Sequence, residues 1–212
     1  MTPIDVGVLI SGRGSNLQAI LDAIAADELA ARVRVVISNR PKAAGLERAA
    51  AAGVPTQFIG HRQFPDRESF DAALVEALRA AQVSWVVLAG FMRILTPVFL
   101  DAFPNRVVNI HPALLPAFPG VDAQTQALAY GVRVTGCTVH LVNEGVDTGP
   151  VLAQAAVPVL QDDDHDSLAA RILEQEHRLL VETLQRIALA GLTVGQPPES
   201  GGRPKVRFGS GP

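Results

Sequence analysis

Residues 4–26, IDVGVLISGRGSNLQAILDAIAA, join an apolar run to a helical segment through a glycine-rich turn. The run over 4–10 is apolar at nearly every position, which is typical of a strand that is covered on both faces of a sheet. From Ser15 onward, helical spacing and good helix formers predict a helix over 15–30. A strand followed at once by a helix is the unit from which parallel α/β sheets are built.

This alternation continues along the chain. Further strands are predicted at 33–38, 54–59, 83–89 and 106–110, and further helices at 43–52 and 67–81. Beyond residue 120 two strands follow each other at 135–142 and 150–159, so an antiparallel pair is expected, and a last helix is predicted over 167–190. The expected fold class is α/β, a Rossmann-like open, mostly parallel sheet flanked by helices, with an antiparallel strand addition near the C-terminus.

Composition restricts the class of protein. The 212 residues, 48% of them apolar and 18% charged, predict one soluble globular domain over 1–190. Residues 191–212 contain ten Gly or Pro and no periodicity, which predicts a disordered C-terminal tail. The formal charge of −3 argues against nucleic acid or an anionic membrane as a partner. One cysteine excludes an internal disulfide, and the N-terminal residues lack the features of a signal peptide, so a cytoplasmic protein is expected.

The turn LISGRGSN, residues 9–16, is the first candidate site. Its glycines expose backbone N–H groups at the start of a helix, where the potential is positive, so it is suited to an anion such as a monophosphate. It is not a dinucleotide fingerprint, because Leu17 occupies the third glycine position, and no Lys-Ser/Thr pair follows as in a P-loop. A plain turn with a Ser or Asn cap explains the motif equally well.

The stretch RVVNIHPALLPAFPG, residues 106–120, is the second candidate site. Asn109 and His111 are two residues apart at the carboxyl end of a predicted strand, so their side chains share one side of it. Pro112 holds His111 extended and prevents the strand from continuing. These residue types suit proton transfer and stabilisation of an oxyanion. The alternative is a structural His and Asn that cap the backbone of the loop.

The loop NEGVDTGP, residues 143–150, carries Asp147 between two glycines. A carboxylate there could orient a catalytic imidazole and keep it protonated, although an Asx-type turn is the commoner use of such an Asp. His140 lies inside a predicted strand and is expected to be a core residue. No three residues have the spacing of metal ligands, so no metal is expected.

Five segments resemble the phosphoribosylglycinamide formyltransferase family, in order and with similar spacing: SGRGSNLQAI, VVLAGFMRILTP, NIHPALLPAFPG, GCTVHLVNEGVDTGPVLAQAAVPV and EQEH. The resemblance covers residues 4–190. It implies transfer of the formyl group of 10-formyltetrahydrofolate to the amine of glycinamide ribonucleotide in purine biosynthesis. It also implies no metal, no further cofactor, no nucleic-acid or membrane partner, and a monomer or homodimer.

The resemblance assigns roles to residues. The catalytic set is Asn109, His111 and Asp147, and the ribonucleotide set is Gly14, Ser15, Asn16 and Glu176. The folate set is Arg67, Met92, Arg93, Ile94, Leu95, Asn109, Asn143, Glu144, Gly145, Val146 and Asp147. Two residues depart from the family pattern: Ala113 replaces a usual Ser, and Asp122 replaces a common His.

Four other classes compete with this interpretation. Methionyl-tRNA formyltransferases carry a further C-terminal domain and formyltetrahydrofolate deformylases an N-terminal one, and the length of this chain favours neither. A catalytically silent binding module would not need Asn109, His111 and Asp147 together. An NAD-dependent oxidoreductase is expected to have the third glycine that Leu17 replaces.

Overall fold

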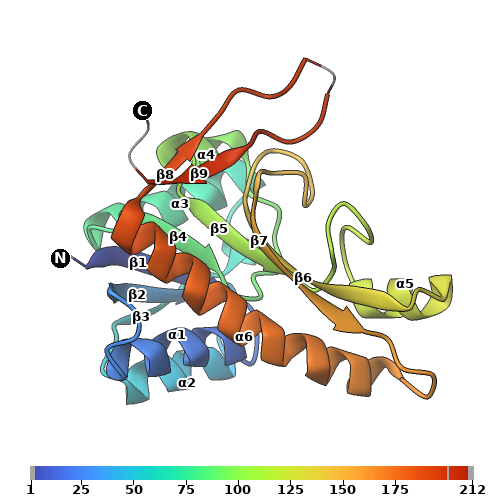
Figure 1. Ribbon diagram of the computed structural model, residues 1–212. Coiled ribbons are helices and arrows are strands. Elements are labelled where there is room, and N and C mark those ends of the chain that lie inside the picture. Colours follow the sequence, from blue (N-terminus) through green and yellow to red (C-terminus); the bar gives the residue numbers. More distant parts are fainter. Residues whose placement is uncertain (1–2, 200, 210–212) are drawn as a thin grey trace.

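The computed structural model describes residues 3–199 and 201–209, and its centre is a seven-stranded sheet (Figure 1). The strand order is β3-β2-β1-β4-β5-β6-β7; β1 to β5 pair in parallel, and β6 and β7 are added antiparallel. The strands are β1 (Ile4–Ile10), β2 (Ala31–Ser38), β3 (Thr56–Phe58), β4 (Trp85–Leu88), β5 (Val107–His111), β6 (Val134–Leu141) and β7 (Val151–Pro158). The expected fold class is confirmed.

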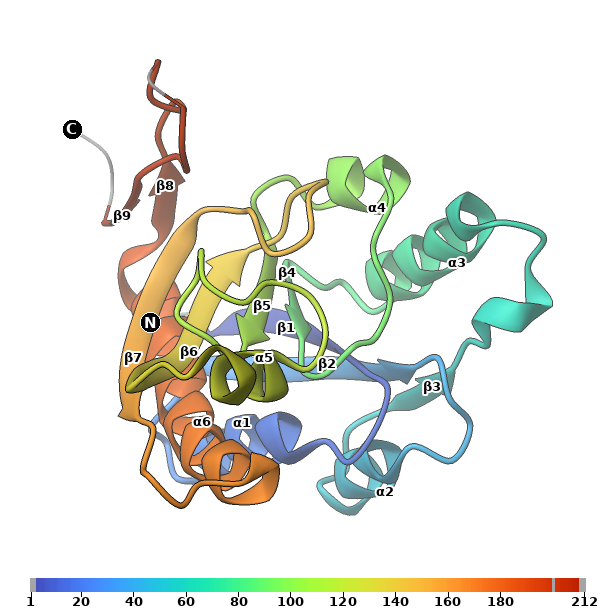
Figure 2. The same cartoon turned by 90° about the vertical axis from the view of Figure 1, so that its right-hand side faces the viewer.

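Helices cover both faces of this sheet. They are α1 (Ser15–Ala25), α2 (Ala44–Ala51), α3 (Arg67–Ala80), α4 (Pro97–Ala102), α5 (Ala123–Tyr130) and α6 (His165–Ala190), with a 3₁₀ turn at His61–Gln63. Helices α1, α2 and α6 lie on one face, and α3 and α4 lie on the other (Figures 1 and 2). The result is three layers, with α5 at the edge near the antiparallel strands.

The central strand β1 shows why its sequence is apolar at successive positions. Val8 and Leu9 are adjacent in the chain and both fully buried. Val8 packs in the cluster beneath α1 and α6, whereas Leu9 packs in the cluster beneath α3. Because side chains alternate between the faces of a strand, a sheet covered on both sides needs apolar residues at both parities.

Several boundaries differ from the predictions. Helix α1 ends at Ala25 rather than residue 30, because the chain turns at Asp27, whose φ is 58°, before β2 begins. Helix α6 begins at His165, where Asp164 accepts a hydrogen bond from the Ser167 N–H at 2.8 Å in a capping box. The short helices α4 and α5 were not predicted: α4 has only six residues, and the two buried residues of α5, Ala123 and Ala127, are small and stand among polar ones.

Part of the segment that was predicted to be a disordered tail, residues 191–212, forms regular structure. Strands β8 (Leu192–Val194) and β9 (Val206–Phe208) pair antiparallel, and Figure 1 shows this hairpin beyond the end of α6. Leu192, Val194, Val206 and Phe208 pack on the main core, and the Arg186 guanidinium lies 3.8 Å from the centroid of the Phe208 ring. The local sequence is poor in structure-forming signals, so contacts with the rest of the protein stabilise the hairpin.

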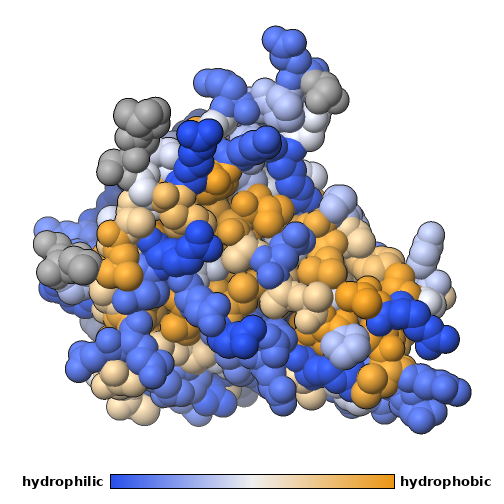
Figure 3. All heavy atoms as spheres, in the orientation of Figure 1, coloured by the Kyte–Doolittle hydropathy of each residue, from blue (hydrophilic) through white to orange (hydrophobic). Residues whose placement is uncertain are grey.

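Polar and apolar residues are mixed on the surface that Figure 3 shows. Figure 3 shows the face that carries α6 and β7, where hydrophilic residues alternate with small hydrophobic patches. Among the helices of the described ranges, none is both long enough and apolar enough to span a bilayer.

The topology places a crevice at the sheet centre. β1 pairs with β2 on one side and β4 on the other, so the order of strands reverses there. Ligands of open α/β sheets bind beyond the carboxyl ends of the strands at such a switch point. The turn at 11–14, the segment after β4 and the end of β5 all emerge at this edge.

Candidate active site

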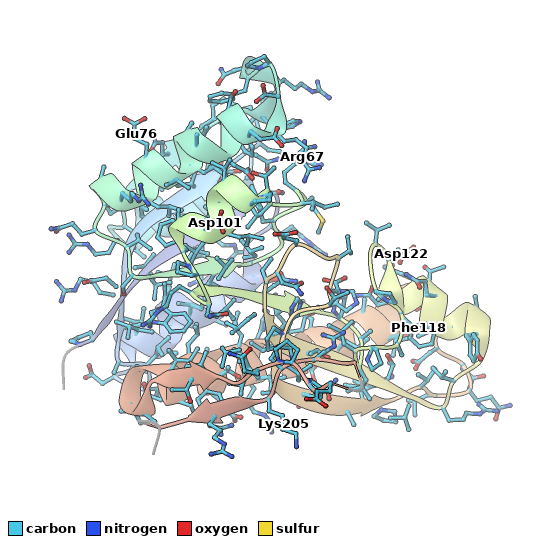
Figure 4. The ribbon with its side chains drawn as sticks, turned by 90° about the horizontal axis from the view of Figure 1, so that it is seen from above. Arg67, Glu76, Asp101, Phe118, Asp122 and Lys205 are labelled. Carbon is cyan, nitrogen blue, oxygen red and sulfur yellow. The ribbon has the colours of Figure 1, made fainter. Side chains whose placement is uncertain are left out.

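A cavity of about 630 Å³ opens beside the carboxyl ends of β4 and β5. Figure 4 shows that Arg67, at the start of α3, and Asp122, before α5, lie at separate sides of this region, and both line the cavity. The rest of the wall comes from the segment after β4, the end of β5 and the loop at 143–150. Its lining residues include Met92, Arg93, Ile94, Asn109, His111, Val146 and Asp147.

His111 is the last residue of β5 and is only 4% exposed. Its Nε2 donates to the Phe118 carbonyl at 2.8 Å, and its Nδ1 lies 3.3 Å from Asp147 Oδ2. Burial lowers the pKa of His111, and the charge of Asp147 and the Phe118 carbonyl counteract only part of that effect. Both ring nitrogens face acceptors, the Phe118 carbonyl and the Asp147 carboxylate, so the geometry suits a ring that carries a proton on each nitrogen, against the effect of burial. Asp147 lies where it would stabilise a proton that His111 takes up.

Asp147 is placed by unusual backbone geometry. Its φ is 52°, and the Gly120 N–H donates to its Oδ2 at 2.7 Å. Burial opposes ionisation of this carboxyl, but hydrogen bonds from His140 and Gly120 and the proximity of His111 outweigh it and lower its pKa. Asp147 is therefore a carboxylate at neutral pH.

His140 is a buried, hydrogen-bonded core histidine, as expected, and it also belongs to this group. It is paired with Asn109 across β5 and β6, and its Nε2 lies 3.1 Å from Asn109 Nδ2 and 3.6 Å from Asp147 Oδ1. Its Nδ1 donates to the Leu141 carbonyl at 2.9 Å. Nε2 can thus accept from the Asn109 amide when the ring is neutral, or donate to Asp147 when it is charged. The described residues contain no group of three potential ligands that could hold a metal ion.

The ribonucleotide set is gathered around the start of α1. Gly14 precedes the helix with φ at 72°, where an added Cβ would lie 2.7 Å from the Gly45 Cα, so only glycine fits. No side chain caps this helix, which leaves the N–H groups that begin at Ser15 without a side-chain acceptor. Asn16 Nδ2 donates to Glu176 Oε2 at 3.0 Å, so residues far apart in the sequence meet. Burial raises the pKa of Glu176 to about 7.

The folate set lines two adjoining cavities. Arg67, Met92, Arg93, Ile94 and Val146 line the larger one; Leu95, Asn143 and Gly145 line a smaller one of about 110 Å³. Met92 and Ile94 are 64% and 56% exposed. Exposed apolar side chains clustered at a cavity indicate a ligand surface. Glu144 is exposed and lines neither cavity, so the structure does not bring it together with the others.

A third cavity, of about 910 Å³, lies beyond the carboxyl ends of β1, β2 and β3 and shares Met92 and Arg93 with the first. Its lining includes five cationic side chains and no Asp or Glu: Arg13, Arg40, Lys42, Arg62 and Arg93. In a chain of net charge −3, this concentrates positive potential on one side of the site.

The two departures from the family pattern have structural explanations. Ala113 contributes its carbonyl, which accepts from Thr138 Oγ1 at 2.6 Å, so its role does not depend on a side-chain hydroxyl. Asp122 accepts a hydrogen bond from the Thr125 N–H at the start of α5, and its Oδ1 lies 3.4 Å from His165 Nε2. The sequence contained no signal for the Asp122–His165 contact, because it depends on where α5 packs.

The comparisons with known proteins identify the family and the fold. The family described as "Formyl transferase" matches residues 5–184. The chain is 48% identical over 207 residues to a phosphoribosylglycinamide formyltransferase of Mycobacterium tuberculosis, covering 98% of this chain and 95% of that protein. A crystal structure of glycinamide ribonucleotide transformylase 1 from Symbiobacterium toebii superposes with a TM-score of 0.93 at 50% identity, covering 99% of this chain and 95% of that one.

Some relatives are much longer. The chain is 53% identical over 174 residues to the trifunctional purine biosynthetic protein adenosine-3 of Drosophila melanogaster, covering 81% of this chain. It spans only 13% of that protein's length, and 19% of its human counterpart. The chain belongs to the formyl transferase family.

Proposed function

We propose that this protein is a phosphoribosylglycinamide formyltransferase. It transfers the formyl group of 10-formyltetrahydrofolate to the amine of glycinamide ribonucleotide, giving formylglycinamide ribonucleotide and tetrahydrofolate in de novo purine biosynthesis. One observation carries the proposal: Asn109, His111 and Asp147 meet at one wall of a cavity whose other walls are apolar and cationic. The near full-length similarity to a bacterial enzyme of that name supports it.

The side chains suit each part of the chemistry. Attack of the amine on the formyl carbon gives a tetrahedral centre whose oxygen becomes negative. The Asn109 amide, held by His140, is positioned to donate a hydrogen bond to that oxygen, and one such donor is typically worth about 3 kcal/mol.

Proton transfer falls to His111 and Asp147. The amine must lose a proton and the leaving nitrogen must gain one. His111 can exchange that proton with the reacting groups, and the charge of Asp147 at 3.3 Å stabilises its imidazolium form.

The remaining residues divide between the two substrates. The free N–H groups after Gly14 suit the phosphate of the ribonucleotide, and Glu176 suits its ribose hydroxyls. The apolar walls made by Met92, Ile94 and Val146 suit the flat ring system of a folate, and Arg67 and Arg93 suit its carboxylates. Because both substrates are anionic, the basic cavity would steer them toward the site.

We further propose that the enzyme works in the cytoplasm, as a monomer or homodimer, with residues 1–190 as the formyltransferase domain. In this proposal the enzyme acts on its two small-molecule substrates without a nucleic-acid or membrane partner. The composition and the small-molecule character of the site support these statements.

The decisive experiment measures release of deformylated folate from 10-formyltetrahydrofolate, with and without glycinamide ribonucleotide. Turnover that depends on the acceptor is expected. Equal turnover in both reactions would identify a hydrolase instead, and none in either would favour a binding module.

A further inference from the structure

The C-terminal hairpin lies outside the matched family residues yet reaches the catalytic loop. The family match ends at residue 184, before β8, β9 and Arg203. Arg203 lies between the two strands of the hairpin and is partly buried. Its guanidinium extends to the loop at 143–150, more than fifty residues earlier in the chain.

The contact is a two-pronged clamp on the backbone. Arg203 Nη1 donates to the Gly149 carbonyl at 2.7 Å, and Nη2 donates to the Asp147 carbonyl at 2.7 Å. A planar guanidinium that binds two acceptors at once restricts orientation as well as distance. The clamped carbonyls include that of Asp147 itself, so the clamp acts directly on the residue that faces His111.

Elsewhere in the loop, the contacts to Asp147 are made by its carboxylate, whereas the clamp holds its backbone. Residues 143–146 and Thr148 are exposed. Asp147 adopts a φ of 52°, a backbone conformation that is less favourable for residues other than glycine. Its carboxylate receives the Gly120 N–H, and Thr148 Oγ1 donates to Asn143 Oδ1 at 2.8 Å. At the end of the loop the Pro150 carbonyl accepts from the Leu141 N–H at 2.9 Å. Between these points Arg203 holds the backbone at the Asp147 and Gly149 carbonyls.

The clamp itself is anchored to that core. The Phe208 ring stacks under the Arg186 guanidinium of α6, and Leu192 and Val206 pack on the main hydrophobic cluster. Gly195 donates its N–H to the Lys205 carbonyl at 2.9 Å, which extends the hairpin toward Arg203. The guanidinium therefore has a fixed base from which to hold the loop.

We propose that Arg203 is a positioning residue for formyl transfer, which holds the backbone of Asp147 so that its carboxylate stays beside His111. This rests on the proposed function. The hairpin is then a structural part of the active site rather than an appendage. The charge of Arg203 also contributes: it is one of the influences that lower the pKa of His111, together with burial and His140.

The test compares Arg203→Met and Arg203→Lys with Lys205→Met as the matched control. Lys205 belongs to the same segment and is exposed, and Figure 4 shows its side chain extending outward. We expect kcat of Arg203→Met to fall about 10- to 100-fold, since small displacements of catalytic groups have effects of this size. Binding of the ribonucleotide, measured by calorimetry, should change less than twofold, because Asn16 and Glu176 do not contact Arg203. Arg203→Lys should lie between wild type and Arg203→Met.

Two further readouts separate positioning from general stability. The pH profile of kcat in Arg203→Met should shift upward, as His111 loses a nearby positive charge while Asp147 and His140 remain. Phe208→Ala, which loosens the anchor and leaves Arg203 intact, should reproduce the loss of kcat in weaker form. A value of kcat within twofold of Lys205→Met would overturn the proposal, and so would a parallel loss of kcat and ribonucleotide affinity.

Amide hydrogen exchange tests the clamp without any turnover. Exchange of residues 143–149 should be faster in Arg203→Met than in Lys205→Met, and equal exchange would overturn the proposal. Absence of transferase activity in the wild type would refute the proposed function alone, since the exchange result does not depend on it.

Discussion

Glu176 is a buried carboxyl whose ionisation should destabilise the protein while serving the substrate. It is 7% exposed on α6, and its pKa is raised from 4.5 to about 7 by burial, against the opposing hydrogen bond from Asn16. We predict that Glu176→Gln stabilises the protein at high pH and weakens binding of glycinamide ribonucleotide. Glutamine keeps an oxygen that can accept from Asn16 but cannot ionise.

The sign and size follow from linkage. A carboxyl that holds its proton more tightly when folded makes the free energy of unfolding fall as pH rises from 4.5 toward 7. At 1.36 kcal/mol per pKa unit, the loss above pH 7 amounts to about 3 kcal/mol. Glu176→Gln cannot ionise and lacks this loss. The free energy of unfolding of the variant minus that of the wild type should therefore be about 3 kcal/mol larger at pH 8.5 than at pH 4. For a chain of this length that corresponds to roughly 6 to 12 °C in melting temperature.

Denaturant unfolding of both proteins at pH 4, 6 and 8.5 measures this directly. Glu182→Gln is the matched control, because Glu182 is exposed on the same helix and paired only with Arg178 at 3.6 Å. The KM for ribonucleotide should rise about 10- to 100-fold in Glu176→Gln, the usual loss for hydrogen bonds to a charged group. A stability difference from wild type that is the same at all three pH values would refute the reasoning.

Three other variants test the site. In Asp147→Asn, kcat should fall about 10²- to 10³-fold. At 3.3 Å the carboxylate and a protonated His111 attract each other by about 5 kcal/mol at an effective dielectric constant of 20, and the variant loses this attraction. Stopped-flow measurement of formyl transfer should show this loss with unchanged ribonucleotide affinity, and a loss below fivefold would contradict the role given to Asp147. Gly149→Ala should lower kcat and the melting temperature together, since the new Cβ would lie 1.8 Å from the Leu141 carbonyl oxygen. Gly53→Ala is the control for crowding, because its new Cβ meets no atom within 4 Å and any loss there comes from the positive φ of Gly53. The double variant Arg40→Gln/Lys42→Gln should lower kcat/KM several-fold at low salt and little at high salt, as expected for steering by the basic cavity; a salt-independent loss would mean direct contact with a substrate.

Much of the fold was predictable from local patterns. Strands such as β1 and β2 are apolar at odd and even positions because both faces of the sheet are covered. Helices α3 and α6 are rich in good helix formers, which predicts them directly. Elements with few residues escaped prediction: α4, α5 and the pair β8–β9 acquire their structure from what they pack against.

The candidate site was also partly predictable. Asn109 and His111 could be found because strand geometry relates residues two apart, and glycines around Asp147 identified its loop. The distance between His111 and Asp147 was not available from these patterns. The family resemblance paired them, and the structure gives 3.3 Å.

The sequence by itself determined the alternation of strands and helices and the tight turn at Gly14 before α1. It also determined that an amide and an imidazole, those of Asn109 and His111, stand at the end of β5, since each of these features depends on near neighbours in the chain. Only the tertiary structure decided the state of those groups. Burial lowers the pKa of His111 and raises the pKa of Glu176, and packing brings His140 to Asn109 and Arg203 to the Asp147 loop. Desolvation and contacts between distant segments depend on how the whole chain encloses a residue, and no local pattern encodes them.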